Sequence, residues 1–482
     1  MHEDALYEDA QYEDDRWRGA KGNSKMIVMK FGGSSLESAA AIERVAGIVA
    51  RAVPRRPLVV VSAMGKTTEQ LLAMGEEAAA GENTHALERL RRLREMHERE
   101  IGALLLDAAR ETLRLILDSH FHEMADLIEQ LADRGEFSLA SSDALASFGE
   151  RLSSQLIALV FSNLGINADH VDARCVVLTD GRHQAAAPLY PQTYARIRDK
   201  ISPLIEAKKV PVLGGFIGAT EKGVTTTLGR GGSDFSAAIF GAGLGVEEIQ
   251  IWTDVDGVMT CDPELVPEAH RVKTISFAEA AELAYFGAKV LHPSTLLPAV
   301  EKNIPIVVLN SRRPEVPGTR IVAEAVPCAN VIKAISCKKG ISIVNIRSTR
   351  MLMAHGFLQR IFESFSRAET AVDMLASSEV SVSLTIDNPA RLPEICQALR
   401  EFSDVTVEEN HAIVCIVGDN LRHTPGVAAR AFGALKGVNI RMISQGASVL
   451  NIGFVVAAGD AEKAVTLLHR EFFSSVDPAV FD

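Results

Sequence analysis

The chain has 482 residues, of which 47% are hydrophobic and 23% charged, and its net charge is −12. This length predicts two to four domains, and the negative charge disfavours nucleic acid as a partner. No apolar run reaches the ~18 residues of a membrane-spanning helix, and the six cysteines form no Cys-x-x-Cys pair, so we expect a cytoplasmic protein with no membrane partner, no disulfide framework and no metal site.

The first 24 residues carry seven acidic groups against three basic ones, with a near-repeat of Leu-Tyr-Glu-Asp and Gln-Tyr-Glu-Asp. A secretory or transit peptide would be apolar or basic. We therefore predict a disordered acidic tail over residues 1–24.

From residue 26 to about residue 322, short β-branched runs alternate with helical patterns. The predicted strands cover residues 26–29, 58–61, 176–178, 210–213, 249–252 and 304–309. This alternation is typical of an α/β domain with a mostly parallel sheet between helices, here over residues 25–325. Residues 86–132 interrupt it with a predicted helical hairpin, in which His120 and His122 belong to a helix surface rather than a metal site.

Two glycine-rich turns in this region each carry a cation. Gly32, Gly33 and Ser34 follow Lys30 at the end of the first strand, and three glycines surround Arg230. A strand that runs into a glycine turn and a helix directs backbone N–H groups at one point, which suits phosphate. One such turn alone is usually structural.

Beyond a Pro/Gly-rich boundary at residues 313–318, the pattern changes to β-α-β-β-α-β over residues 341–407, the ferredoxin-like unit. The pattern then starts again at residue 412 and ends without its fourth strand. Residues 331–337 can supply that strand. We therefore predict a first unit at residues 338–409, inserted within a second unit made of residues 326–337 and 410–482.

Six stretches in order resemble aspartate kinase of the amino-acid kinase family, whose C-terminal regions are tandem ACT domains. They are residues 30–35, 60–68, 148–152, 225–234, 252–258 and 286–293. The resemblance implies transfer of the ATP γ-phosphate to the side-chain carboxylate of L-aspartate, giving 4-phospho-L-aspartate, the first step towards lysine, threonine and methionine. Because the chain ends soon after the second unit, we expect a monofunctional enzyme, and the family suggests a homodimer or homotetramer.

The resemblance also implies roles for residues of the acceptor site. Lys30 and Asp234 become the catalytic residues, with Lys30 on the transferred phosphoryl group. Arg230 can pair with the substrate α-carboxylate through two parallel hydrogen bonds, and Glu150 pairs with the α-ammonium. The remaining substrate-binding residues are Thr68 and Ser233.

Most of the expected ATP-binding residues belong to two motifs that each follow a predicted strand, the glycine turn after residues 26–29 and the segment after residues 249–252. ATP also implies Mg2+, for which the sequence offers no ligand cluster. They are Lys30, Gly32, Gly33, Ser34, Thr253, Asp254, Met259 and Lys289. One position departs from the family, because Glu264 stands where relatives often have an arginine.

The first ACT unit resembles the segments that hold lysine in lysine-sensitive aspartate kinases. These residues are Met351, Gly356, Phe357, Leu358, Val372, Asp373, Ser377, Ser378 and Glu379. Asp373 and Glu379 can oppose the two ammonium groups of a lysine ligand. Ala354 replaces a serine of some relatives, and threonine, through Gln445 of the second unit, is the rival effector.

Two other functions stay open at this point. The acceptor could be glutamate or acetylglutamate, although the tandem C-terminal units and residues 148–150 argue against it. The chain could also be an inactive amino-acid sensor, which the intact Lys30, Glu150, Arg230, Asp234 and Lys289 disfavour.

Overall fold

The computed structural model describes residues 26–287, 293–324, 328–348 and 355–482. It divides the chain into two compact units, Met1–Asp254 with Thr295–Val307 and Val255–Ser294 with Val308–Asp482, as far as these are described. Among the described helices, none is long and apolar enough to cross a membrane.

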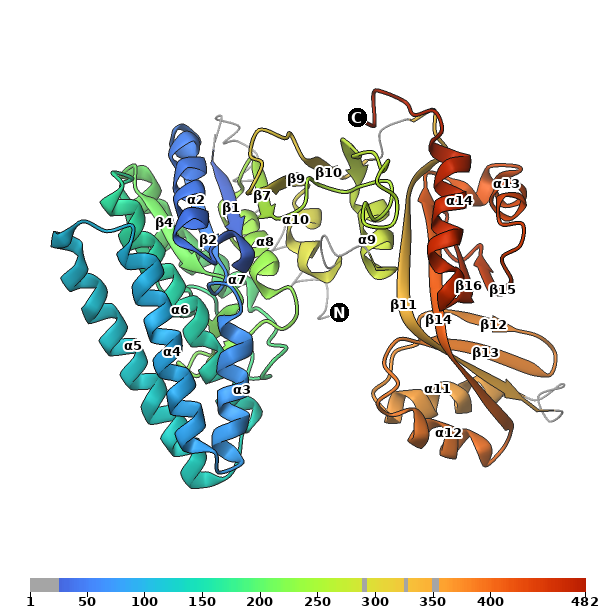
Figure 1. Cartoon of the computed structure of the whole chain (residues 1–482), viewed down its shortest axis with the longest axis horizontal. Helices are drawn as coiled ribbons and strands as arrows, with labels where there is room; N and C mark the ends of the chain where they lie inside the picture. Colours follow the sequence, from blue (N-terminus) through green and yellow to red (C-terminus); the bar gives the residue numbers. More distant parts are fainter. Residues whose placement is uncertain (1–25, 288–292, 325–327, 349–354) are drawn as a thin grey trace, which may run out of the picture. The chain divides into compact units, whose positions relative to one another are not determined.

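The first unit is built on a sheet in the order β3-β4-β2-β1-β7-β9 (Figure 1). Its strands are β1 (Ile27–Phe31), β2 (Pro57–Val61), β3 (Ala168–Val171), β4 (Val210–Gly214), β7 (Glu248–Thr253) and the start of β9 (Ile306–Asn310), which continues past Val307, the last residue of the unit. The pairs β1–β2, β1–β7, β2–β4 and β3–β4 are all parallel. Strand β1 is buried between two neighbours, which explains its continuous apolar run. The predicted mostly parallel sheet is therefore confirmed.

Helices flank this sheet, with α6 against β3 and β4, and α8 against β1 and β7. The helices of the unit are α2 (Ala39–Ala52), α3 (Thr67–Ala79), α4 (Asn83–Gly102), α5 (Asp107–Arg134), α6 (Leu139–Asn163), α7 (Tyr190–Glu206), α8 (Gly232–Leu244) and α10 (Leu297–Glu301). Helices α4 and α5 form the predicted helical insertion and run side by side (Figure 1). The prediction that His120 belongs to a helix surface is wrong, because it is buried and its ring bonds to the Ile116 carbonyl, whereas His122 is exposed as predicted.

One predicted strand is wrong. Residues 176–178 form no strand, because the Val176 and Val177 amides turn back to the Ala173 carbonyl, and Leu178 makes only a single bridge to Ala219. The edge of the sheet is instead β3, whose four residues are all half-buried and include Asp169 and His170. A polar edge strand lacks the apolar run by which the other strands were found.

The second unit contains a parallel pair, β8 (Thr274–Ser276) with β10 (Thr319–Val322), and the helix α9 (Phe277–Tyr285). It also contains an antiparallel sheet in the order β12-β13-β11-β14-β16-β15. Its strands are β11 (Ile332–Arg347), β12 (Leu375–Ser377), β13 (Ser381–Ile386), β14 (Asp404–Gly418), β15 (Ile440–Gln445) and β16 (Asn451–Ala457). The helices are α11 (Phe357–Arg367), α12 (Leu392–Arg400), α13 (Val427–Ala434) and α14 (Ala461–Phe473).

Strands β11 and β14 differ from the sequence prediction in length. Residues 331–337 and 341–347 were expected as two strands, but they form one strand of 16 residues with bulges on either side of Ile341. Likewise, β14 joins the last strand expected for the first ferredoxin-like unit to the first strand of the second. The loops expected between these segments are therefore replaced by continuous pairing of the two long strands.

Candidate active site

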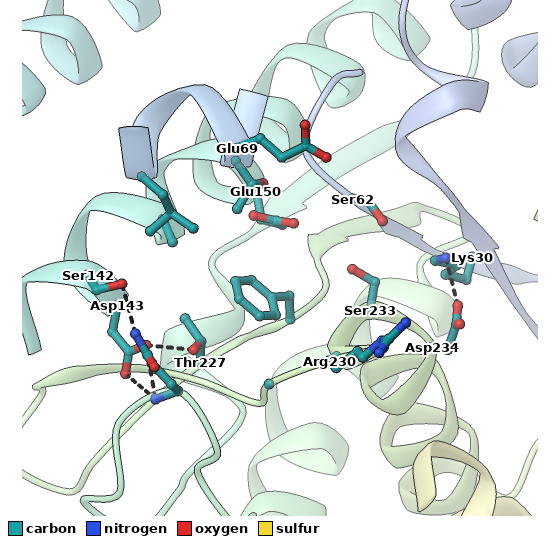
Figure 2. Close-up of a pocket in the computed structure, with 18 residues that line it drawn as sticks. Lys30, Ser62, Glu69, Ser142, Asp143, Glu150, Thr227, Arg230, Ser233 and Asp234 are labelled. Atoms are coloured by element: carbon teal, nitrogen blue, oxygen red, sulfur yellow. Dashed lines mark hydrogen bonds and ion pairs between the residues drawn. The ribbon is translucent and has the colours of Figure 1, made fainter. Parts of the chain in front are cut away.

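A cavity of about 700 Å³ opens in the first unit, beside the carboxyl ends of β1, β2 and β4. The residues that line it are Lys30, Ser62, Thr68, Glu69, Leu72, Ser142, Asp143, Ala146, Glu150, Gln184, Phe216, Thr227, Gly229, Arg230, Gly231, Gly232, Ser233 and Asp234. All six residues predicted to be catalytic or to bind the acceptor are among them. Figure 2 shows Lys30 and Asp234 at one end of this cavity, and Ser142, Asp143 and Thr227 at the opposite end.

Lys30 reaches the cavity from near the end of β1. Its backbone pairs with Val60 of β2 on one side and with Ile251 of β7 on the other. Its Nζ lies 2.6 Å from Oδ1 of Asp234, in the first turn of α8 (Figure 2). The two side chains are only 12% and 15% exposed, so water screens this pair less than a surface pair. The ammonium group is therefore held at a defined place at the cavity wall.

Glu150 is a buried carboxyl group on α6, and one of its oxygens is satisfied by protein. Oε1 accepts the Ala63 amide at 3.1 Å, whereas Oε2 has no hydrogen-bond partner in the described part of the chain. Burial raises the pKa of Glu150 to about 8, opposed by the Ala63 amide and by the charge of Lys30. An unpaired acceptor in a cavity is suited to a ligand donor such as an ammonium group.

Close backbone approaches explain the glycines around the cavity. A Cβ on Gly33 would lie 2.7 Å from the Gly65 carbonyl oxygen. A Cβ on Gly214 would lie 2.9 Å from the Glu150 Cβ, and one on Gly215 would lie 2.8 Å from the Ser233 Cβ. These distances leave no room for a side chain, so the glycines bring the polar groups around the cavity together.

Arg230 lies between two glycines with positive φ, Gly229 at 77° and Gly231 at 71°. Gly231 is the N-cap of α8, so Arg230 and Ser233 sit at the N-terminal end of this helix. Arg230 is exposed, and within the described residues no carboxylate forms an ion pair with it. A planar guanidinium beside a helix N-terminus is suited to a carboxylate.

The predicted nucleotide residues are distributed over both units. Gly32 donates its amide to the Trp252 carbonyl at 3.2 Å, and Ser34 follows in a 3-10 turn. Thr253 ends β7, where its hydroxyl lies 3.2 Å from the Asp254 carboxylate. In the second unit, Met259 is half-buried and forms an isolated β-bridge with Arg271. Glu264 is exposed, and the predicted Lys289 lies outside the described residues.

The predicted effector residues of the second unit surround the start of α11 and the strand pair β12–β13, whereas Met351 lies outside the described residues. Gly356 is the N-cap of α11 with φ 79°, followed by Phe357, which is buried, and Leu358, which is exposed. The Lys338 Nζ lies 2.9 Å from Asp373, and burial raises the pKa of this carboxyl group. The other effector residues are the half-buried Val372 and the exposed Ser377, Ser378 and Glu379.

Sequence reasoning missed several residues of the cavity. Gly214 ends the buried strand β4 and Gly215 follows it, the same signal that singled out Gly32 and Gly33. Phe216 has φ 64°, a strained conformation that no sequence pattern reveals. Asp143 precedes Glu150 by seven residues, two helical turns, and this spacing could have identified it.

Comparisons with known proteins agree with this geometry. The model of the amino acid kinase family matches residues 25–310, and an ACT domain model matches residues 414–472. The chain is 39% identical over 469 residues to "Aspartokinase 1, chloroplastic" of Arabidopsis thaliana, covering 93% of this chain and 80% of the relative.

Two crystal structures of E. coli aspartokinase III are also similar, one in complex with aspartate and ADP (R-state), the other with lysine and aspartate (T-state). Each has a TM-score of 0.80 and covers 93% of this chain and 100% of its own, at 36% and 35% identity. The chain therefore belongs to the amino acid kinase family and, within it, to the aspartokinases.

Proposed function

We propose that the protein transfers the γ-phosphoryl group of ATP to the side-chain carboxylate of L-aspartate, giving 4-phospho-L-aspartate and ADP. The observation that carries this proposal is the unpaired Oε2 of buried Glu150 in a cavity that also presents Arg230. An α-amino acid carries an ammonium group and a carboxylate on one carbon atom. Glu150 would bind the ammonium group and Arg230 the carboxylate, which leaves the side chain free to reach Lys30.

The chemistry requires positioning and charge rather than a base. The side-chain carboxylate of free aspartate, with a pKa of about 3.9, is already ionised at neutral pH. Its oxygen attacks the γ-phosphorus while the bond to the leaving ADP oxygen breaks, and no proton has to be removed. Lys30 would offset the negative charge that accumulates between nucleophile and phosphate, and Asp234 keeps its ammonium group in place.

The nucleotide would be held by the glycine turn after β1 and by residues that follow β7. We assign to this role Lys30, Gly32, Gly33, Ser34, Thr253, Asp254, Met259 and Lys289. Among the described residues, no group of three His, Cys, Asp or Glu side chains could hold a metal ion. Mg2+ bound with the phosphates of ATP would neutralise part of their charge.

The test compares three acceptors in an assay coupled to ADP release. L-Aspartate offers both α-groups and the right length, L-glutamate is one methylene longer, and N-acetyl-L-glutamate lacks the ammonium group that Glu150 would bind. We expect turnover with aspartate far above turnover with the other two. Equal or greater turnover with either alternative would contradict the assignment, and no turnover with any would favour an inactive sensor.

We further propose that free lysine inhibits the protein through the first ACT unit, with threonine acting through Gln445 as the second candidate. The similar E. coli structure in complex with lysine supports this. The binding residues would be those around Asp373 and Glu379, together with Met351. Because Lys338 already contacts Asp373, an effector ammonium has to share this carboxylate with Lys338.

The domain arrangement and the assembly are proposals as well. The continuous strands β11 and β14 support a first ACT unit at residues 338–409 inserted in a second one at residues 326–337 and 410–482. We propose a cytoplasmic homodimer or homotetramer, whose reaction begins the synthesis of lysine, threonine and methionine.

A further inference from the structure

Asp143 is a buried carboxylate at the wall of the cavity to which the proposed reaction assigns no role. Asp143 is 1% exposed and lies on α6, seven residues before Glu150. At 1.5 Å per residue, this places it about 10 Å along the helix from Glu150 and on the same face. Both carboxyl groups line the cavity.

Three groups from two other segments, residues 183–184 and the strand that contains Thr227, form hydrogen bonds with this carboxylate. The Thr227 hydroxyl donates to Oδ1 at 2.6 Å, and the backbone amide nitrogen of Gln184 lies 3.1 Å from both carboxylate oxygens. The Nδ1 of His183 lies 2.7 Å from Oδ2, and because a carboxylate only accepts, this nitrogen carries the proton. Figure 2 shows Asp143 bonded to Thr227.

The same two segments are packed directly against each other. The Ala186 amide donates to the Thr227 carbonyl at 3.0 Å, and a Cβ on Gly229 would lie 2.7 Å from the Gln184 carbonyl oxygen. Arg230 follows Gly229 in the chain, so the backbone that carries its guanidinium is fixed through these contacts. Asp143 holds this backbone to α6, together with the neighbouring Ser142, whose hydroxyl accepts the Gln184 side-chain amide at 3.1 Å.

We propose that Asp143, together with Thr227 and His183, is a positioning unit for the selection of acceptor length, because it fixes the α-carbon of the acceptor in the cavity by setting the separation between Arg230 and Glu150. This inference rests on the proposed clamping of the acceptor by these two residues. Helix α6 carries Glu150 itself and, two turns away, the anchor of the Arg230 loop. One rigid helix therefore positions both residues that would hold the α-carbon of the acceptor.

Aspartate and glutamate differ by one methylene group, which a binding site distinguishes by only about 10- to 200-fold. Such discrimination requires that the α-carbon of the amino acid is held at a fixed distance from Lys30, because a loop that can shift accommodates the longer side chain. A buried carboxyl group that forms several hydrogen bonds is rigid, since any movement leaves a buried polar group unpaired. Asp143 therefore has the properties that length selection needs.

The experiment uses the full-length chain and three variants of the unit. Asp143→Ala removes all its hydrogen bonds, Asp143→Asn keeps an oxygen for Thr227 and the Gln184 amide, and Thr227→Val removes one hydroxyl at nearly constant volume. Asp172→Asn is the matched control, because Asp172 forms an ion pair with Arg174 in the same unit but does not line the cavity. For each protein, kcat and KM are measured for aspartate, glutamate and ATP, together with Tm.

We expect Asp143→Ala and Thr227→Val to raise KM for aspartate about tenfold or more and to reduce the aspartate-over-glutamate preference by a similar factor. KM for ATP should change less than about twofold. Asp143→Asn should keep KM for aspartate and the aspartate-over-glutamate preference close to their wild-type values. Combining Asp143→Ala with Arg230→Lys should add little to the effect of either alone, because both act on one interaction.

Unchanged KM and preference in folded Asp143→Ala or Thr227→Val, even with a lower Tm, would overturn the inference and leave a purely structural role. Equal losses towards aspartate and ATP would do the same. If Asp143→Ala does not fold, Thr227→Val still decides. Absence of aspartate turnover in the wild type would instead overturn the proposed function, so the two failures are distinct.

Discussion

The Lys30 ammonium lies 2.6 Å from the Asp234 carboxylate, which joins the end of β1 to the first turn of α8. These two elements also carry the two glycine turns of the cavity. The ion pair thus places a cation between the turn that would hold phosphate and the loop that would hold the acceptor. A cation at this position can offset charge only if it stays there when the substrates bind.

Replacing Lys30 by alanine should lower kcat by about 10²-fold or more while Tm changes little. The ammonium group is needed chiefly when charge develops in the transition state, and removal of one such group typically costs 10²–10³-fold. Steady-state kinetics and thermal unfolding test this. Lys209→Ala is the control, since Lys209 forms a similar ion pair with Asp169 outside the cavity. A folded Lys30→Ala variant with wild-type kcat would refute the role.

Replacing Arg230 by lysine should raise KM for aspartate about 10- to 100-fold and leave KM for ATP nearly unchanged. Lysine keeps the charge but loses the paired hydrogen bonds, and a hydrogen bond to a charged group contributes about 1.5–3 kcal/mol. Initial rates with one substrate varied at a time separate the two constants. Equal effects on both substrates would count against Arg230 as the residue that binds the acceptor.

The pKa of Glu150 near 8 predicts a specific pH dependence. Burial disfavours the ionised form, so below about pH 8 the free protein holds this carboxyl group protonated and attracts an ammonium group weakly. The value of kcat/KM for aspartate should therefore rise with pH towards about pH 8, because this constant reports ionisations of the free enzyme. Glu150→Gln should be low and flat over the same range. A wild-type profile without this rise would show that Glu150 is ionised at lower pH or does not bind the ammonium group.

Lysine should inhibit the wild type, and Glu379→Ala should weaken this inhibition by about tenfold or more without changing uninhibited kcat. Glu379 is exposed and Asp373 is buried beside Lys338, so Glu379 is the carboxylate with room for a new ammonium group. Titration of lysine and threonine against the wild type, Glu379→Ala and the control Glu401→Ala tests this. An unchanged lysine response in Glu379→Ala, or a wild type insensitive to lysine, would contradict the proposal.

The acceptor side of the cavity was largely predictable from the sequence. Lys30, Arg230 and Asp234 belong to glycine turns, whose backbone requirements leave a clear pattern in the chain. Glu150 was identified only through its resemblance to a family, because a single glutamate in a helix has no pattern of its own. Gly214 packs closely against Glu150 and the Ala63 amide binds its Oε1, and both residues are distant from it in sequence.

The features that were not predicted arise from tertiary contacts. Strand β3 is polar and lies at the edge of the sheet, so the hydrophobic pattern does not mark it. The merging of two strands into β11 depends on pairing with β14, which is about 70 residues away in the chain. Asp143 gains its position from His183, Gln184 and Thr227, a set that comes together only in the folded chain.

The most direct test of the account is the formation of an acyl phosphate from L-aspartate and ATP by the full-length chain, trapped with hydroxylamine as the hydroxamate. We expect one hydroxamate per ADP released with aspartate, far less with glutamate, and neither product with N-acetyl-L-glutamate. Hydroxamate formation should be lost in Glu150→Gln and Lys30→Ala. Release of ADP without hydroxamate, or equal hydroxamate from all three acceptors, would contradict the claim that Glu150 and Arg230 hold aspartate for phosphorylation beside Lys30.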